Sequence, residues 1–442
     1  MLASDWESLE AAAARVHILN YSQKQGDAYQ LEPSIFPSLA CAAPGRTGLL
    51  PLLQKLTWTT TNNVIYPYIF LFLSPTIKDL TISMATGHIA SDRMRFSLLA
   101  SLTSQCPSVC SLRLDAGKLQ DPVPSWGDLF SGNSASAFTS LSLWRALGSL
   151  SLQNMDICAL IDVLVTLPAL TNLELHWCQI SASPNGRVTT GFPALQYLGT
   201  YHCNMDITLY VLKRMSCTPL VRLCLSIAAR PSETRWAELF SYLQNGILHD
   251  RLAAVSFSID HDPPMSMFPR YSDRITWTFQ TISPLLHFRH ISEFKHSRLC
   301  ILDLDDNDIA SIARAWPRLK LFILHSAHTI RPRLTHHALL PFSRHCPELE
   351  ILAMVIDTTR VGKCGEKLGR GSWGRSLREL IVYNSPIYHS SRVAAFISDI
   401  FPNVRAISSD NGYREWNAVQ MIIPVLTEVR RQEANHWCRS NS

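Results

Sequence analysis

Apolar residues recur with one spacing in three consecutive segments of the chain: Leu147–Ile157, Leu170–Ile180 and Leu195–Met205. Each fits L-x-x-L-x-L-x-x-(N/C)-x-L apart from Met155 and Thr200, and their starts lie 23 and 25 residues apart. This spacing is typical of a leucine-rich repeat, in which one strand and one helical segment form a unit. Because such a unit buries its apolar face only against its neighbours, the pattern predicts a stack of units and a binding scaffold.

Prolines extend the same period along the chain. Proline cannot continue a helix and pushes the preceding residue out of helical geometry, so each is predicted to end a helix and open the turn into the next strand. They lie at Pro51, Pro75, Pro107, Pro168, Pro193, Pro219, Pro317, Pro347 and Pro402.

Fourteen units follow when a first apolar anchor is assigned to each predicted strand. Their mean spacing is about 30 residues, slightly above the usual range, and the loop-like segments Asp121–Ser136 and Asp260–Arg274 occupy two of the long gaps. Of the fourteen, the repeat that begins at Ile291 fits the apolar pattern least well. The anchors are Val16, Leu53, Ile77, Val109, Leu147, Leu170, Leu195, Leu220, Leu252, Ile291, Leu319, Leu349, Leu377 and Val404.

Helices are predicted between the strands. Asp156 and Asp206 precede apolar runs, where a carboxylate can accept hydrogen bonds from the free N–H groups of a first turn. Two further helices are predicted at His336–Cys346 and Val393–Phe401. Glu415–Arg431 is predicted to be a terminal helix, kinked at its internal proline, that covers the last repeat.

These elements define the predicted architecture. Parallel strands stack about 4.8 Å apart, whereas helices are roughly 10 Å across, so the strand side closes in and the helical side fans out. We therefore predict an α/β leucine-rich-repeat-like solenoid, a horseshoe with a parallel concave sheet and convex helices. Residues 1–414 would form the irregular solenoid, and residues 415–442 the C-terminal capping helix and tail.

The concave face is the predicted binding surface for a protein partner. The leucines of L-x-x-L-x-L point into the core, so the residues that alternate with them face outward. Much of that face is small and polar, and the alternative is that its larger residues merely decorate an exposed sheet. The larger or charged candidates are Arg113, Asp115, Glu174, His176, Tyr201, His325 and Tyr383.

Composition narrows the choice of partner and compartment. The 442 residues are 47% hydrophobic and carry a net charge of only +5, which favours a folded chain and predicts neither nucleic-acid nor membrane binding. The first residues do not form a secretory signal, and Val64–Leu73 is about half the length of a membrane helix. An intracellular protein of the cytoplasm or nucleus is expected, with reduced cysteines and with Cys178 and Cys203 in the core.

The chain contains one G-x-G-x-x-G match, Gly369–Gly374, inside the basic segment 360–378. A nucleotide-binding version must follow a strand and open a helix, whereas here the next residues, Leu377–Val382, have the pattern of a strand. Three interpretations of this segment therefore remain, in falling order of preference: a solvated loop, a contact to an acidic partner and a nucleotide site.

Other candidate chemical sites are rejected. The acidic run Asp303–Asp308 lacks the glycine and glutamate of a calcium loop and is better explained as a strand end followed by a capped helix. Eight histidines lie between His287 and His345, but no C-x-x-C accompanies them. Since no catalytic motif is present either, we expect no enzyme activity, no cofactor and no metal.

Several short segments, taken in order, resemble the F-box/leucine-rich-repeat proteins of mushroom-forming fungi. The resemblance covers nearly the whole chain, although each segment alone has little specificity. The segments are Asp5-Trp6, Arg15-Val16 with Leu19, 49–51, 56–58, 72–75, 302–306, 315–317, 346–349, 385–387 and 400–404.

The resemblance implies that the repeats select a substrate for a cullin–RING ubiquitin ligase, while an N-terminal F-box docks on its Skp-type adaptor. An F-box of roughly forty residues is not found, because repeat-like sequence begins by Val16. Skp and cullin are therefore expected partners only if an F-box exists upstream. Two hypotheses follow: the substrate-recognition part of an SCF-type ligase subunit, and a free-standing repeat protein that binds a partner without a ligase role.

Overall fold

The computed structural model describes residues 3–22, 34–42, 48–60, 64–84, 101–116, 140–180, 189–228, 231–259, 276–297, 301–326, 332–362, 374–410 and 414–440. These residues form two compact units, Met1–Pro219 (unit 1) and Leu220–Ser442 (unit 2). The predicted loops Asp121–Ser136 and Asp260–Arg274, and most of the G-x-G-x-x-G segment, lie outside the described residues. The division into a solenoid to residue 414 and a cap from 415 stays a prediction.

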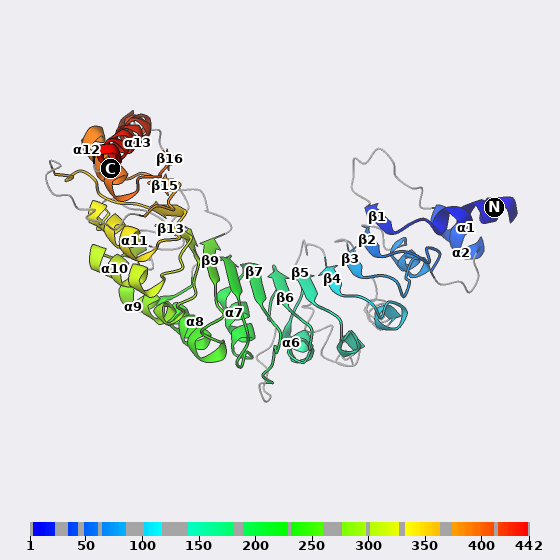
Figure 1. Cartoon of the computed structure of the whole chain (residues 1–442). Coiled ribbons are helices and arrows are strands. Elements are labelled where there is room, and N and C mark those ends of the chain that lie inside the picture. The colour runs from blue at the N-terminus through cyan, green and yellow to red at the C-terminus, as the bar shows by residue number, and fades with distance from the viewer. Residues whose placement is uncertain are drawn as a thin grey trace. The chain divides into compact units, whose positions relative to one another are not determined.

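Unit 1 is built on parallel strands that pair in chain order, β1 to β7 (Figure 1). The described strands are β1 (Ile18–Ser22), β2 (Lys55–Thr60), β3 (Asp79–Met84), β4 (Ser111–Asp115), β5 (Ser149–Gln153), β6 (Asn172–His176) and β7 (Tyr197–Cys203). The helical elements are α1 (Ala3–Ala13), α2 (Ile35–Ala42), η1 (Tyr66–Leu71), η2 (Ser140–Leu143), α6 (Cys158–Leu164) and α7 (Met205–Leu212).

Unit 2 continues the same alternation of strand and helix. Its main parallel sheet contains β8 (Arg222–Ile227), β9 (Ala254–Ile259), β11 (Glu293–Ser297), β13 (Leu321–His325), β14 (Ile351–Met354), β15 (Glu379–Ile381) and β16 (Ala406–Ser408), in that order. The other elements are α8 (Glu233–Gly246), β10 (Thr276–Thr278), α9 (Phe279–Ile282), η5 (Ser283–His287), β12 (Ile301–Asp303), α10 (Asp306–Ala315), η6 (His336–Ala338), α11 (Leu339–His345), α12 (Ser390–Ile400) and α13 (Arg414–Ser440).

All fourteen predicted anchors lie two residues before a strand of a main sheet, from Val16 before β1 to Val404 before β16. Thirteen of them are buried, the exception being the half-buried Val16. The repeat with the weakest sequence pattern also fits, since its anchor Ile291 is fully buried and precedes β11. Both units are therefore α/β leucine-rich-repeat solenoids, as the apolar pattern predicts.

The three clearest repeats stack in register. Leu150 pairs with Leu173, and Leu173 with Leu198, in adjacent strands, and all three side chains are buried. Thr200 departs from the repeat pattern but still fills its core position, because its hydroxyl hydrogen-bonds the Thr208 hydroxyl at 3.0 Å. Pairing a buried hydroxyl in this way avoids the cost of an unsatisfied polar group in the core.

The helix caps differ in detail from the prediction. Helix α7 is capped by Asn204, whose side chain accepts from the Ile207 N–H, and Asp206 lies within its first turn instead. Asp156 stands one residue before the N-cap of α6, and its carboxylate accepts from the Cys158 N–H at 2.8 Å. The prediction for Asp206 was wrong because an asparagine two residues earlier offers an equally good acceptor.

Two predicted segments have the expected local structure. In the acidic run, strand β12 ends at Asp303 and Asp305 caps α10, with Asp308 completing a capping box. The apolar run Val64–Leu73 contains the short 3₁₀ helix η1, with Ile69 fully buried. Among the described residues, no helix combines the length and hydropathy needed to cross a bilayer.

The sequence did not predict the second sheet, in which β10 pairs in parallel with β12. Strand β10 carries Trp277, which is fully buried and packs edge-on against Trp236 at 4.7 Å and beside His296 at 4.6 Å between ring centroids. Strand β10 follows no apolar anchor of the repeat, so the repeat period did not predict it.

The last helix is longer than the predicted Glu415–Arg431, because α13 begins at Arg414 and continues to Ser440. Trp416 is buried in its first turn and donates its indole N–H to the Ser385 carbonyl oxygen at 2.8 Å. One turn later, Gln420 accepts from the Ile407 N–H of β16 and donates to the Arg405 carbonyl oxygen. The first half of α13 is thus fixed to the last strand of unit 2.

Replacing Leu173 with alanine tests the stacked core of unit 1. Leu173 is fully buried between paired leucines on both sides, so we expect a loss of about 2–5 kcal/mol in the free energy of unfolding. Urea denaturation measures it. The exposed neighbour Asn172 is the control, because its alanine variant should change stability by no more than about 0.5 kcal/mol. Equal effects of the two variants would contradict the stacking.

Acid should destabilise unit 2 through His296. Complete burial lowers the pKa of His296 from 6.5 to about 4, so the unfolded chain binds a proton there at a pH where the folded chain does not. Stability from this group is full above pH 6.5 and falls as the pH drops toward 4. We expect urea midpoints between pH 7.5 and 5 to change less in His296→Asn than in the wild type. The same pH slope in both would refute this.

Candidate protein-binding faces

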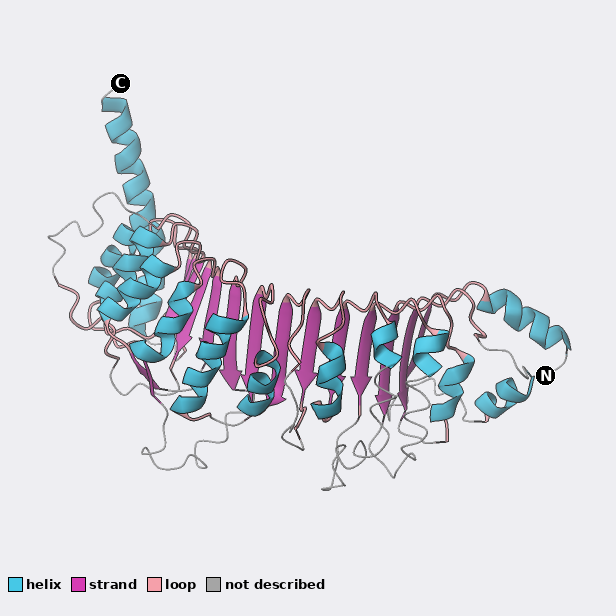
Figure 2. Cartoon of the chain, turned by 90° about the horizontal axis from the view of Figure 1, so that it is seen from below, coloured by secondary structure: helices cyan, strands magenta, loops and turns pink. Residues whose placement is uncertain are grey.

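The open face of each unit is defined here as the sheet face whose side chains alternate with the buried core positions. In unit 1, helices α6 and α7 lie on the other side of strands β5 to β7 (Figure 1), and the view from below shows helices in front of the strands (Figure 2). The register brings outward residues of separate repeats into rows across the sheet. One row runs Arg113, Ser151, Glu174, Gly199, and the next runs Asp115, Gln153, His176, Tyr201.

A histidine and a tyrosine form the centre of the unit 1 face. The rings of His176 on β6 and Tyr201 on β7 stack with centroids 4.7 Å apart and planes 17° apart. On the same strand, His176 Nε2 lies 3.5 Å from Glu174 Oε2, and both side chains are half-buried. The sequence predicts that these three residues share a face, and the structure brings them into contact.

Gly199 makes room for that stack. The hydroxyls of Tyr197 and Tyr201 hydrogen-bond each other across it. A Cβ at position 199 would lie 2.6 Å from the Tyr201 ring, closer than such atoms approach in folded proteins. The glycine therefore lets the Tyr201 ring lie flat along its own strand.

Asp115 and Arg113 complete the face on the far side of β5. Asp115 accepts hydrogen bonds from the Ser83 hydroxyl and from the Asn154 side-chain amide, both at 3.0 Å. Arg113 is exposed and lies opposite Ser151 in the strand register. The carboxylate of Asp115 is thus held in a fixed position, whereas the guanidinium of Arg113 reaches into solvent.

The electrostatics of the face favour an ionised Glu174. The hydrogen bond from His176 is the largest cause that lowers the pKa of Glu174, and the charges of His176 and Arg113 act in the same direction against partial burial. A carboxylate beside cationic donors stays ionised at lower pH than usual. This face therefore presents both charge signs together with aromatic rings.

A second aromatic pair borders the unit 1 face. The rings of Trp177 and His202 stack with centroids 4.0 Å apart and planes 5° apart. Both residues have a positive φ, 48° and 54°, which is uncommon for large side chains. Trp177 remains 39% exposed. The alternation of inward and outward residues did not predict this pair on the face, because a positive φ changes the direction of a side chain from the one that strand alternation gives.

The unit 2 face contains the two remaining predicted residues. The rings of His325 and Tyr383 stack with centroids 3.8 Å apart. Tyr383 was predicted to lie on a strand, but β15 ends at Ile381 and Tyr383 has a φ of 49°. This turn places the Tyr383 ring against His325 of β13, which is two strands from β15 in the sheet order.

Unit 2 also carries an ionic group that sequence analysis missed. Arg222 of β8 reaches across β9 to Glu293 of β11 with N–H···O distances of 3.2 and 3.3 Å. The Lys295 ammonium lies 3.9 Å from the same carboxylate. The apolar pattern of the repeat that begins at Ile291 is weak, so the outward residues of this repeat were not among the predicted binding residues.

Five of the seven predicted residues lie together on unit 1: Arg113, Asp115, Glu174, His176 and Tyr201. The other two lie on unit 2. No group of three or more histidine, cysteine or acidic side chains in the described part of the chain is arranged to hold a metal ion. Cys178 and Cys203 are buried, as predicted, and neither forms a disulfide.

A scan against protein-family models finds none that matches this chain, and a search of curated proteins finds no match. Solved structures give distant similarities at 14% identity. An internalin (InlF) from Listeria monocytogenes matches 74% of this chain and 86% of its own, with a TM-score of 0.33. The leucine-rich-repeat protein LIC12759 of Leptospira interrogans matches 92% and 86%, with a TM-score of 0.44.

A structure of the Rad7 and Elc1 complex in yeast matches 91% of this chain and 89% of the compared chain, at 14% identity and a TM-score of 0.36.

Removing the imidazole at position 176 should raise the pKa of Glu174 toward the ordinary carboxyl value. In the wild type the pKa is lowered, so this pairing stabilises the fold above the ordinary carboxyl pKa and is lost as the pH falls through the lowered one. An NMR titration of the Glu174 carboxyl in His176→Gln measures the shift. His202→Gln is the control and should leave it unchanged. An unaltered titration in His176→Gln would contradict the contact.

Proposed function

We propose that the protein is a protein-interaction scaffold and that the open face of unit 1 is its main contact surface for a protein partner. The observation that carries this proposal is the contact cluster of Glu174, His176 and Tyr201, with Arg113 and Asp115 beside it. Tyrosine and arginine are enriched among the residues that dominate binding energy at protein interfaces.

The fixed geometry of the cluster supports binding rather than mere surface decoration. Tyr201 is held by a ring stack and by a hydroxyl hydrogen bond, and Asp115 by two donors. Side chains ordered before binding lose less conformational entropy when a partner arrives. Trp177, partly exposed at the edge of the same face, adds apolar area that a partner can cover.

We further propose that this partner is a substrate, and that the chain acts as the substrate-recognition part of an F-box subunit in an SCF-type ubiquitin ligase. The resemblance of the sequence segments to fungal F-box/leucine-rich-repeat proteins supports this step. The alternative is a free-standing binding protein that uses the same face without a ligase role. A measurement of whether ligase subunits bind the chain distinguishes these two roles.

Truncating Tyr201 should weaken partner capture. We expect Tyr201→Ala to lower the recovery of a specific partner from an extract of the organism's own cells by about tenfold or more, because interface anchors commonly contribute over 1–2 kcal/mol. Quantitative mass spectrometry measures the recovery. The matched control is Tyr388→Ala, which removes a 74% exposed tyrosine outside the sheets. Equal recovery with the two variants would contradict a binding role for this face.

The ligase role has its own test. The captured proteins should include a Skp-type adaptor and a cullin, and a transcript read upstream of Met1 should contain an in-frame F-box. If the adaptor and the cullin are missing while a Tyr201-dependent partner is captured, the protein is a free-standing scaffold.

A further inference from the structure

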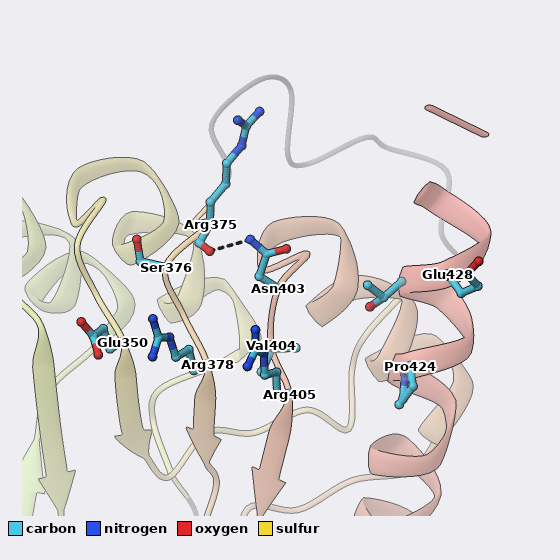
Figure 3. A pocket seen from close by; sticks show the side chains of 10 residues that line it. Glu350, Arg375, Ser376, Arg378, Asn403, Val404, Arg405, Pro424 and Glu428 are labelled. Atoms are coloured by element: carbon cyan, nitrogen blue, oxygen red, sulfur yellow. Dashed lines mark hydrogen bonds between the residues drawn. The ribbon is translucent and has the colours of Figure 1, made fainter. Parts of the chain in front are cut away.

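A pocket of about 730 Å³ lies in unit 2, between the start of strands β14, β15 and β16 and the middle of α13 (Figure 3). It is separate from the open faces, since its wall is formed by residues that precede the strands. Glu350, Arg378 and Arg405 stand immediately before β14, β15 and β16. Figure 3 shows them side by side, with Pro424 and Glu428 of α13 opposite.

The backbone fixes the two arginines at neighbouring positions. The Arg405 N–H donates to the Arg378 carbonyl oxygen at 2.8 Å, and the Arg378 N–H donates to the Glu350 carbonyl oxygen at 2.9 Å. Adjacent parallel strands lie about 4.8 Å apart. The backbones of the two arginines are therefore held side by side, and their like charges repel unless an anion lies between them.

The uncharged polar groups of the pocket are already used by the fold. Ser376 donates to the Pro347 carbonyl oxygen at 2.6 Å, Asn403 to that of Arg375 at 2.7 Å, and Thr427 to that of Ile423 at 3.0 Å. Of the lining side chains, those of Arg378 and Arg405 are the ones available to bind an anion.

The guanidinium groups of Arg378 and Arg405 have no hydrogen-bonding or ion-pair partner among the described residues. Both are exposed, so nothing in the fold requires their charge. A third arginine, Arg375, lines the same pocket, although its side chain points away from the other two in Figure 3. Guanidinium groups match the planar, two-oxygen geometry of carboxylates and phosphates.

We propose that this pocket binds an acidic peptide segment of a protein partner, with Arg378 and Arg405 each holding a carboxylate. The volume is far larger than one inorganic anion needs. The acidic side chains at the two ends, Glu350 and Glu428, limit the positive charge and favour carboxylates spaced along a chain over a dense polyanion such as nucleic acid.

The test is fluorescence anisotropy with a fluorescein-labelled hexaglutamate peptide at low salt, using hexaglutamine as the uncharged probe. Arg378→Gln and Arg405→Gln should each weaken hexaglutamate binding about two- to fivefold, the range that exposed charge pairs give. The double variant should weaken it on the order of tenfold. Glu350→Gln removes a repulsive charge and should tighten it.

The matched control is the double variant Arg145→Gln/Arg251→Gln. It lowers the net charge by the same two units as the pocket double variant, at exposed arginines that do not line the pocket. It should bind hexaglutamate like the wild type, and so should Tyr201→Ala, so this result is independent of the function proposed for the open face.

Three outcomes would overturn the proposal. The control double variant could lose as much affinity as the pocket double variant, which would indicate non-specific charge attraction. The wild type could bind hexaglutamine as well as hexaglutamate. Inorganic phosphate alone could bind in an Arg378- and Arg405-dependent way while the peptide does not, which would make this a small-anion site instead.

Discussion

The parallel pairing of successive strands, each placed two residues after an apolar anchor, is the constraint on which the other features depend. The pairing fixes the register, and the register decides which outward residues of different repeats become neighbours. Leu150, Leu173 and Leu198 share one core row. A shift of one residue in any strand would exchange its core and surface residues, so burial of the leucines also enforces the surface pattern.

The same constraint explains how polar groups far apart in sequence are brought together on unit 1. Glu174 and His176 stand two residues apart on one strand and therefore point to the same side. Tyr201 reaches them from the next strand because the register pairs it with His176. Gly199, between the two tyrosines of that strand, leaves the space in which the Tyr201 ring lies. The core thus determines where the face lies, and the small outward residue determines the shape of the cluster.

Most of the backbone could be predicted from the sequence, because anchors such as Ile291 carry a periodic apolar signal even where the repeat is irregular. The pairing of β10 with β12 could not be predicted, since β10 follows no apolar anchor of the repeat. Side-chain contacts were predictable only as shared faces. Tyr383 and Trp177 leave the strand alternation through a positive φ, which no residue type at those positions signals. Asn204 displaced Asp206 as a cap because both residue types accept the same hydrogen bond.

The pocket beside α13 shows the other consequence of a register that repeats. Every repeat places one residue just before its strand. In unit 2 that residue is small or apolar before β8, β9 and β11, and before β13 it is Lys320, whose ammonium lies 3.6 Å from the Glu348 carboxylate. At the last two strands the position holds arginine twice. A stacked fold keeps two such residues adjacent, because backbone hydrogen bonds join their strands. Neither guanidinium has a partner among the described residues, and an acidic ligand is the partner that we propose for both.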